Sequence, residues 1–377
     1  MRAKIQFNNI VIGRNTLFLP LTNSILNMTN RFLFYICSVA FLMACKSHAD
    51  LKETSSAVIQ PKNFTSDFNL AFGSCNKQNE TNHLWDDILE IRPDVWIWGG
   101  DNIYADTDNM AKLRKMYGQQ SKVKGYAKLL NQTPIIGTWE DHDYGVNDGG
   151  VEFKSKKESQ QEFLNFMKVA DDSPRRQQEG VYAMHDFNSS KGKIKVLVLD
   201  TRYFRTALTA DHETGKRTKP NNYGEGTILG ETQWNWLEKE LEFSEADFNI
   251  VVSSVQLLSG EHGFETWGNF PHEVDRFKSL VTRSKAKGVI VLSGDRHISE
   301  FSKTTVENMN YPLIDFTSSG LTHAYHKFSG EPNKYRVGEV VAVESFGLLQ
   351  FNFETNQVLM QIIGNNHKLL GQLEQKY

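Results

Sequence analysis

Short apolar runs recur along the chain, and each ends at glycine or at polar residues. An uninterrupted run of this length is typical of a strand that is buried on both faces in an α/β sheet. The runs that predict such strands are residues 70–72, 95–98, 134–136 and 289–292, and two further strands are predicted at residues 195–199, which follow an alternating pattern, and at residues 249–254.

Between these runs, apolar residues return at helical spacing. The first such segment stops before Pro93, the second opens with a polar cap and carries Trp236 on its apolar face, and Gly288 stops the third. The repeated order of strand, helix and strand predicts an α/β fold. The predicted helices are residues 82–91, 232–241 and 272–287.

Two further patterns complete the body of the chain. Residues 348–353 and 357–362 alternate between apolar and polar around a Glu-Thr-Asn turn, which predicts a β-hairpin. Residues 209–230 are polar and contain several Gly and Asn, which predicts a surface loop able to reach over a site. Since no repeat or composition change interrupts residues 67–377, we expect one domain there.

The N-terminal region has the pattern of an export signal. Arg31 precedes an apolar run at residues 32–42 that is short for a membrane span, and Met28 is a plausible alternative start. Leu42-Met43-Ala44-Cys45 resembles the bacterial lipobox, so we expect residues 1–44 to be cleaved and Cys45 to be lipidated. An ordinary soluble export signal is the alternative. Residues 45–66 then form the lipidated cysteine and a polar tether.

Charge and cysteine content limit the kinds of ligand that the protein is expected to bind. Without residues 1–44 the chain has 38 bases and 45 acids, a formal charge of −7, which argues against general nucleic-acid binding and suits divalent cations. Cys37 would leave with the signal and Cys45 would carry lipid. Cys75 then remains as a single thiol that cannot form an internal disulfide, and metal ligation is one reason for such a residue.

Several candidate ligands directly follow predicted strands, whose carboxyl ends gather at one edge of an α/β sheet. Asp101 and Tyr104 are three residues apart, and Cys75 and His297 follow two other strands. Thiolate, phenolate and carboxylate are all anionic and favour a trivalent ion, so these four residues predict an Fe(III) site. For Cys75 alone, simple packing is the commoner role.

A second cation site would share Asp101. The oxygen donors Asp141, Asp295 and the amide of Gln256 suit Ca²⁺, with Mn²⁺, Mg²⁺ or Zn²⁺ as alternatives. Two cations roughly 3.5–4 Å apart can activate a water and hold a phosphoryl group.

Three further side chains are candidates for the reaction itself. His142 could then protonate a departing alkoxide, because imidazole titrates near neutrality. Arg202 or Arg296 could hold phosphate oxygens, although a salt bridge within its loop explains Arg202 equally well.

The same motifs resemble those of the PhoD-like phosphatase family, within the calcineurin-like metallophosphatases. The resemblance spans roughly residues 68–325 and implies a four-layer αββα sandwich, two β-sheets flanked by helices, with an Fe(III) and Ca²⁺ centre that hydrolyses phosphate esters. Glu140 stands where an aspartate is usual, and longer members carry an N-terminal β-sandwich domain for which residues 45–67 leave no room. The matching segments are Gly73-Ser74-Cys75, residues 100–106, residues 138–145, residues 199–203 and residues 293–297.

Together these observations predict an exported, lipid-anchored phosphohydrolase that cleaves monoesters, diesters or both. We expect a monomer that acts on a small phosphate ester, held at a bacterial membrane in the periplasm or at the cell surface. One alternative is a dedicated phosphodiesterase for nucleotides, phospholipid head groups or wall polymers. Another is a surface lipoprotein that keeps the fold but only binds a ligand.

Overall fold

The computed structural model describes residues 62–377, all within one compact unit, Ile59–Tyr377. The predicted signal, the alternative start at Met28 and the lipidated Cys45 lie outside the described residues. In the described part, no helix is both long and apolar enough to cross a membrane.

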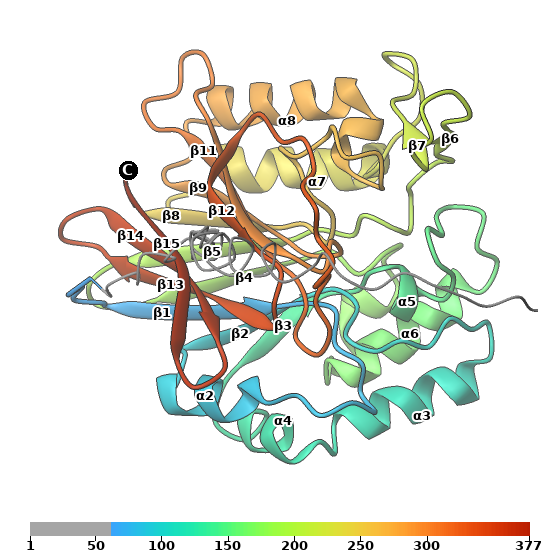
Figure 1. Cartoon of the computed structure of the whole chain (residues 1–377), viewed down its shortest axis with the longest axis horizontal. Coiled ribbons are helices and arrows are strands. Elements are labelled where there is room, and N and C mark those ends of the chain that lie inside the picture. Colours follow the sequence, from blue (N-terminus) through green and yellow to red (C-terminus); the bar gives the residue numbers. More distant parts are fainter. Residues whose placement is uncertain (1–61) are drawn as a thin grey trace, which may run out of the picture. The chain divides into compact units, whose positions relative to one another are not determined.

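Two large β-sheets form the centre of this unit (Figure 1). The six-stranded sheet has the order β15-β14-β13-β1-β2-β3, and the seven-stranded sheet has the order β12-β10-β11-β9-β8-β5-β4. The first comprises β1 (Phe68–Gly73), β2 (Val95–Gly99), β3 (Ile135–Thr138), β13 (Ser345–Asn352), β14 (Gln357–Gly364) and β15 (Lys368–Lys376). The second comprises β4 (Ala183–Asn188), β5 (Lys193–Val198), β8 (Phe248–Val252), β9 (Val289–Ser293), β10 (Ser299–Thr304), β11 (Leu313–Ser318) and β12 (Arg336–Val341).

The strands predicted from apolar runs form the parallel part of each sheet. β1, β2 and β3 run parallel to one another, and so do β5, β8, β9 and β11. The predicted hairpin is present as β13 and β14, and β13 pairs antiparallel with β1. Parallel strands bring their carboxyl ends to the same edge, so the loops that follow them can share one site.

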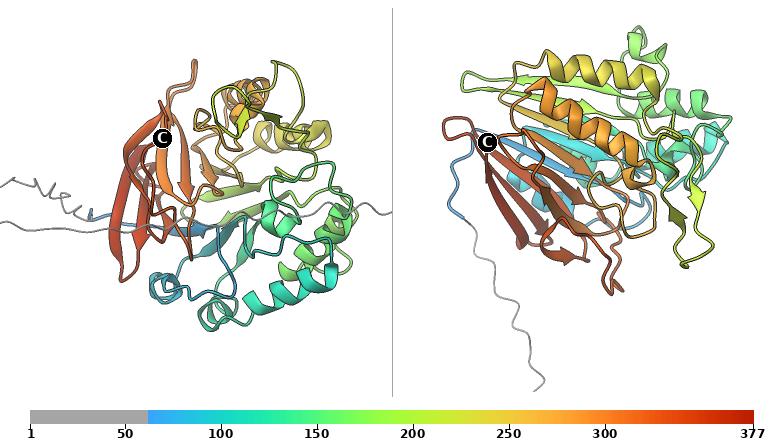
Figure 2. Two further views of the ribbon diagram at one scale, coloured as in Figure 1. Left: turned by 45° about the vertical axis from the view of Figure 1, so that its right-hand side comes forward. Right: turned by 90° about the horizontal axis from the view of Figure 1, so that it is seen from above.

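Helices cover both outer faces of the sheet pair (Figures 1 and 2). α7 and α8 pack on the seven-stranded sheet, while α2, α3, α4 and α6 pack on the six-stranded sheet. The four-layer αββα arrangement implied by the resemblance is therefore confirmed. The helices are α2 (Leu84–Ile91), α3 (Met110–Gln120), α4 (Lys124–Leu129), α5 (Asp141–Tyr144), α6 (Lys156–Phe166), α7 (Gly230–Glu242) and α8 (Pro271–Ser284).

Each boundary between layers has its own apolar core. Between the sheets, the rings of Phe72 and Phe316 meet edge to face with centroids 4.9 Å apart. Under the six-stranded sheet, Trp85 of α2 lies against Trp98 of β2 at 5.8 Å. The two sheets are thus held rigidly from both sides, which fixes the strand ends that carry the candidate ligands.

Three details differ from the sequence predictions. α7 begins at Gly230 without a side-chain cap from its N-cap residue, and Trp234 rather than Trp236 is its fully buried tryptophan. α8 ends at Ser284, because Lys285 adopts a left-handed conformation with φ 56°. The loop at residues 209–230 contains a short hairpin of β6 (Thr209–Ala210) and β7 (Thr218–Lys219).

Candidate metal centre

The candidate ligands come together at the carboxyl ends of the parallel strands. Cys75 and Asp101 each lie two residues beyond a strand, β1 and β2. Asp141 is the first residue of α5, close after β3, and Asp295 and His297 follow β9. Both sheets therefore contribute to one cluster, as the sequence predicted from the strand ends.

The first group brings together the four residues that were predicted to hold Fe(III). The Oδ2 atom of Asp101 lies 3.3 Å from Sγ of Cys75 and 3.2 Å from the hydroxyl oxygen of Tyr104. That hydroxyl lies 3.4 Å from Nε2 of His297. Four potential ligand atoms from three loops thus face one another at separations compatible with a shared ion.

A second group lies beside the first and shares Asp101. Potential ligand atoms of Asp101, Asp141 and His142 lie within 4.8 Å of one another, as do those of Cys75, Asp101 and His297. In the described chain, Asp295 belongs to neither group. Its carbonyl oxygen lies 3.6 Å from Sγ of Cys75. Sharing of one carboxylate by two groups is the arrangement that a bridging ligand needs.

Two buried oxygen atoms in this region have no hydrogen-bond partner among residues 62–377. One is Oδ1 of Asp141, and the other is Oε1 of Gln256. Gln256 is fixed by its amide nitrogen, which donates to Glu300 at 2.9 Å and to Thr317 at 2.8 Å. Buried oxygens without partners are costly, and a bound cation is one way to satisfy them.

The electrostatics of the first group also fit a cation. Burial, together with neighbouring acids, raises the pKa of Cys75 and raises the pKa values of Asp101 and Tyr104 well above their usual range. In the absence of a positive charge, the anionic forms oppose one another. A metal ion would reverse this balance, because it stabilises thiolate, phenolate and carboxylate together.

Four of the candidate ligands adopt a left-handed backbone conformation. Their φ angles are 57° for Cys75, 51° for Asp101, 66° for Asp295 and 54° for His297. This region is unfavourable for residues with a Cβ atom, and strained residues often cluster at functional sites.

His142 is oriented by a second acid. Its Nδ1 lies 2.8 Å from Oδ1 of Asp106, and its Nε2 lies 3.7 Å from Oδ1 of Asp141. The His142 ring packs against that of Tyr104, with centroids 4.1 Å apart and the ring planes tilted by 31°. Burial lowers the pKa of His142, but the bond to Asp106 and the nearby Asp101 and Asp141 outweigh it and raise the pKa to about 10.

The predicted phosphate contact of Arg202 needs correction. Its side chain is completely buried, and it forms ion pairs with Glu140, at 3.0 Å, and with Glu265. Its Nη1 donates to the carbonyl of Gly149 at 3.0 Å. Because the guanidinium has no exposed surface and faces two carboxylates, the alternative of a salt bridge describes it better.

Arg296 is also paired. Its Nη2 donates to both carboxylate oxygens of Glu331 at 2.8 Å, and its guanidinium stacks over Phe264 at 4.2 Å. Its Nε is buried without a partner among the described residues. A phosphate contact by Arg296 stays a prediction.

Residues outside the predicted set also hold the centre together. Nδ1 of His297 lies 3.1 Å from the carbonyl oxygen of His323, which directs Nε2 towards Tyr104 and the rest of the first group. The hydroxyl of Ser319 lies 3.0 Å from Sγ of Cys75 and accepts a hydrogen bond from the backbone of His297. Ser319 directly follows β11, which the sequence did not predict because Asp315 and Thr317 interrupt its apolar residues, and His323 lies five residues beyond the end of that strand.

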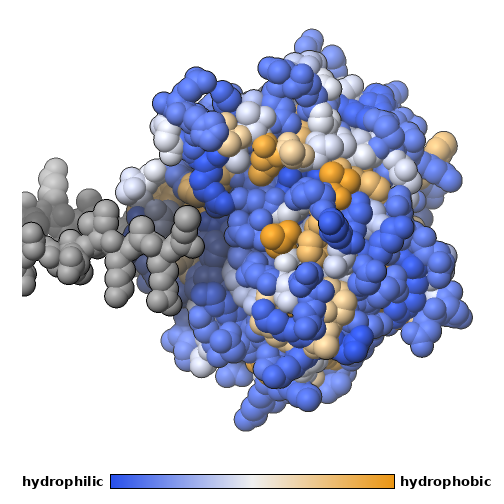
Figure 3. All heavy atoms as spheres, turned by 90° about the vertical axis from the view of Figure 1, so that its right-hand side faces the viewer, coloured by the Kyte–Doolittle hydropathy of each residue, from blue (hydrophilic) through white to orange (hydrophobic). Residues whose placement is uncertain are grey.

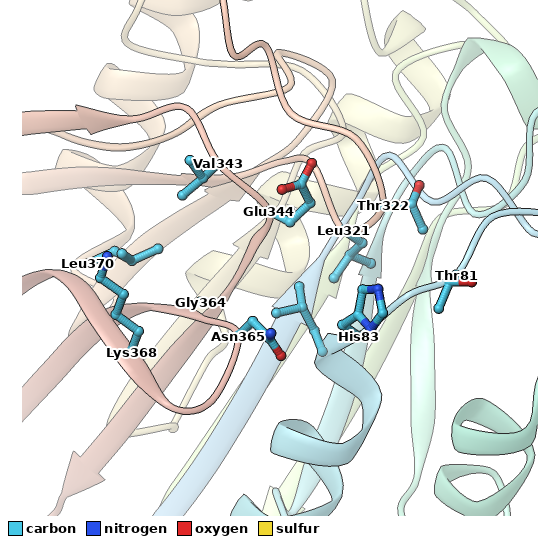
Figure 4. A pocket seen from close by; sticks show the side chains of 11 residues that line it. Thr81, His83, Leu321, Thr322, Val343, Glu344, Gly364, Asn365, Lys368 and Leu370 are labelled. Atoms are coloured by element: carbon cyan, nitrogen blue, oxygen red, sulfur yellow. The ribbon is translucent and has the colours of Figure 1, made fainter.

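The surface near the candidate centre has an apolar patch and a cavity. Figure 3 shows the face that carries α5 and the β6–β7 hairpin, where apolar side chains gather near the middle of a mostly polar surface. A separate cavity of about 490 Å³ is lined by Thr322, His83 and Lys368, among others (Figure 4). The Thr322 hydroxyl lies 3.4 Å from the carbonyl oxygen of Cys75, so this cavity shares a wall with the candidate centre.

The αββα sandwich, with a cluster of metal-binding side chains at its strand ends, defines a metallophosphatase-type fold. The model of the PhoD-like phosphatase family matches residues 70–332, well over half of the chain. The chain therefore belongs to the PhoD-like phosphatase family.

Individual proteins resemble this chain in sequence or in fold. Alkaline phosphatase D of Bacillus subtilis (strain 168) is 21% identical over 251 residues, covering 60% of this chain and 42% of the relative. The chain thus spans less than half the length of that curated relative. The solved structure of PhoD superposes with a TM-score of 0.65 at 16% identity, covering 84% of this chain and 70% of that chain. The structure of GAP50, the anchor in the inner membrane complex of Plasmodium, superposes with a TM-score of 0.53 at 12% identity, covering 83% of this chain and 89% of that chain.

Proposed function

We propose that this protein is a phosphoric ester hydrolase that uses two metal ions bridged by Asp101. The observation that carries the proposal is the sharing of Asp101 between two groups of potential ligands. Family membership and the curated relative, whose name is alkaline phosphatase D, support the same reaction class.

The proposed metals differ because the donor sets differ. Cys75, Asp101, Tyr104 and His297 would hold Fe(III), because three of them bind as anions. The second ion, for which Ca²⁺ is proposed and Mn²⁺, Mg²⁺ and Zn²⁺ are the alternatives, would be held by Asp101 and Asp141 of the second group, with Gln256 and Asp295 as further donors from outside that group. Metal ions in such a pair supply Lewis acidity and lower the pKa of water.

The protein's own groups position the substrate and move a proton. Nε2 of His142 would donate a proton to the alcohol oxygen that leaves, and Asp106 would keep the ring in the required orientation. Arg202 would act only through Glu140, whose side chain accepts a hydrogen bond from the backbone N–H of Asp141. We therefore describe Arg202 as a positioning residue.

The proposed setting is outside the cytoplasm of a bacterium. The N-terminal pattern supports export and lipid attachment at Cys45, which would hold a monomeric enzyme at the membrane while it meets small phosphate esters. Changing Cys45 to Ser, with a non-lipoprotein signal in place of residues 1–44, should move the protein from the membrane fraction to the soluble fraction. Membrane attachment that survives this change would refute lipidation at Cys45.

The proposed activity is tested by assaying p-nitrophenyl phosphate beside bis-p-nitrophenyl phosphate. Activity should depend on calcium, fall after chelation and return when metal is restored. The ratio of the two rates distinguishes a monoesterase from a diesterase. If metal-loaded protein hydrolyses neither compound, nor any of a panel of other phosphate esters, the proposal fails and a ligand-binding lipoprotein becomes the better description.

A further inference from the structure

A groove of about 540 Å³ lies between the segment after α5 and the β6–β7 hairpin. Its size is that of a small-molecule site. Its walls combine apolar and charged side chains from two parts of the chain that are far apart in sequence. They include Asp148, Val151, Glu152, Arg205, Leu208 and Arg217.

The groove begins next to the candidate metal centre. The backbone N–H of Asp148 donates to Oδ2 of Asp141 at 2.7 Å, so the groove wall directly contacts a proposed ligand. The side chain of Asp148 is in turn ion-paired with Arg217 of the hairpin loop. A phosphate ester bound at a metal held by Asp141 could therefore extend its organic part along this wall.

Arg217 is the available cation of the groove. Its side chain is 55% exposed, and the ion pair with Asp148 engages only Nη2. Arg205, by contrast, is buried and faces Glu265 at 2.9 Å. Since a guanidinium presents five N–H donors, Arg217 can keep Asp148 and still bind a second anionic group.

The other lining groups define the rest of the ligand. Val151 is 46% exposed and, with Leu208, offers an apolar surface to a carbon chain. Glu152 is exposed and accepts an N–H from Gly150 at 2.8 Å, so it opposes an anion and would favour a cation. Arg217 keeps N–H donors that Asp148 does not engage, whereas one carboxylate oxygen of Glu152 already accepts the N–H of Gly150, so the groove offers its free charge to an anion beside Arg217.

We propose that this groove binds the alcohol part of the ester and that Arg217 selects alcohols that carry a second anionic group. The proposal rests on the proposed phosphohydrolase function and deepens it by naming a substrate class. Arg217 is then a specificity-determining residue, because it contacts substrate away from the bond that breaks. A carboxylate or a second phosphoryl group would serve equally, since both accept paired N–H bonds from arginine.

Binding of phosphonates tests this without turnover. Full-length, metal-loaded protein is titrated by calorimetry with 3-phosphonopropionate, propylphosphonate and 2-aminoethylphosphonate, which share the phosphoryl head and differ in the terminal group. We expect 3-phosphonopropionate to bind about tenfold more tightly than propylphosphonate, as for a charge-assisted pair. Arg217→Ala should reduce this ratio to near one, and Arg217→Lys should leave an intermediate ratio.

Lys219→Ala is the matched control. Lys219 lies on the same hairpin, carries the same charge and pairs with Glu213 at 3.1 Å, outside the groove lining. The Lys219→Ala variant should keep the wild-type ratio of affinities for 3-phosphonopropionate and propylphosphonate. Thermal unfolding of each variant shows whether it is folded, and the ratio within each variant cancels a general loss of binding. If Arg217→Ala does not fold, Arg217→Gln carries the test.

Three results would overturn the proposal: an unchanged ratio in Arg217→Ala, tighter binding of 2-aminoethylphosphonate, or no discrimination by the wild type. Hydrolysis of p-nitrophenyl phosphate by the same preparations separates this failure from failure of the proposed function. If the protein hydrolyses esters but does not discriminate between the phosphonates, the proposed function stands and the role of the groove is refuted. If it discriminates between the phosphonates but hydrolyses no ester, the groove binds as proposed and the proposed function is refuted.

Discussion

Nδ1 of His142 lies 2.8 Å from Oδ1 of Asp106, which leaves Nε2 as the ring nitrogen turned towards Asp141. If His142 protonates the leaving alcohol, Asp106→Asn should lower kcat about 10- to 100-fold, with little change in KM. The loss should be larger for an alkyl phosphate, whose alkoxide needs a proton, than for p-nitrophenyl phosphate. Steady-state kinetics with both substrates measure this difference.

Asp108→Asn is the control for that prediction, because Asp108 is an exposed acid in the same loop. It should leave both rates near the wild-type values. An equal loss for both leaving groups in Asp106→Asn would show that the pair does not assist departure of the alcohol.

Replacement of Asp101 by Asn should remove the bridge between the two ligand groups. An amide lacks the negative charge that two cations share, so we expect one metal equivalent to be lost and kcat/KM to fall at least about 10³-fold. Metal analysis after gel filtration and a phosphatase assay provide the readouts. Near wild-type activity in folded Asp101→Asn protein would disprove the bridging role.

The iron assignment predicts coloured protein. Phenolate or thiolate bound to Fe(III) gives a charge-transfer band in the visible region, so the purified protein should absorb there and Tyr104→Phe should lose or shift the band. Visible spectra with elemental analysis check both points. Fully active, colourless protein that contains only Zn²⁺ or Mn²⁺ would rule iron out.

The buried ion pairs of Arg202 predict a large effect on stability. Arg202→Met leaves Glu140 without its cation and Glu265 with only Arg205, so the free energy of unfolding should fall by about 3–5 kcal/mol. Adding Glu140→Gln should recover part of this loss, which a double-mutant cycle in urea measures. A stable Arg202→Met variant with strongly reduced kcat/KM would instead favour direct contact with phosphate.

His262 predicts loss of stability in acid. Its Nδ1 accepts the N–H of Phe264 and its Nε2 lies 3.1 Å from the carbonyl oxygen of Ser259, which requires the neutral ring. Burial, with the positive charges of Arg296 and Lys216, lowers the pKa of His262 to about 3. The unfolded chain binds a proton first as the pH falls below about 6.5.

The stability that His262 contributes should therefore be complete above pH 6.5 and be lost at about 1.4 kcal/mol per pH unit towards pH 3. His262→Gln should remove about 2 kcal/mol of the difference between pH 6.5 and pH 5, as measured by urea unfolding. His212→Gln, at an exposed position, is the control. Equal acid sensitivity in wild type and His262→Gln would contradict the assignment.

Most of the parallel strands were predictable because their apolar residues need no partner to be recognised; β11 was not predicted, because Asp315 and Thr317 interrupt its apolar residues. All five residues of β2 are buried, so its sequence is apolar throughout. β10 was not predicted, because it buries Ser299, Glu300 and Ser302 and satisfies them through distant groups such as Arg336. Such a strand has no apolar pattern until the fold supplies its partners.

The candidate site divides in the same way. Cys75, Asp101 and Asp295 could be grouped from the sequence because each follows a predicted strand. The burial of Arg202 could not be predicted from the sequence. It depends on Glu140 and Glu265, which lie 62 and 63 residues away in opposite directions along the chain. Long-range polar pairs leave no periodic pattern in a sequence.

The left-handed backbone at Cys75, Asp101, Asp295 and His297 has a consequence for engineering. Each such residue costs roughly 1 kcal/mol relative to glycine, which adopts this conformation without a clash of Cβ. Selection of variants for heat resistance alone, in metal-free medium, would therefore enrich Gly at these four positions. The most heat-resistant variants would be those that had lost the metal ligands, so a selection for stability must measure metal binding in every round.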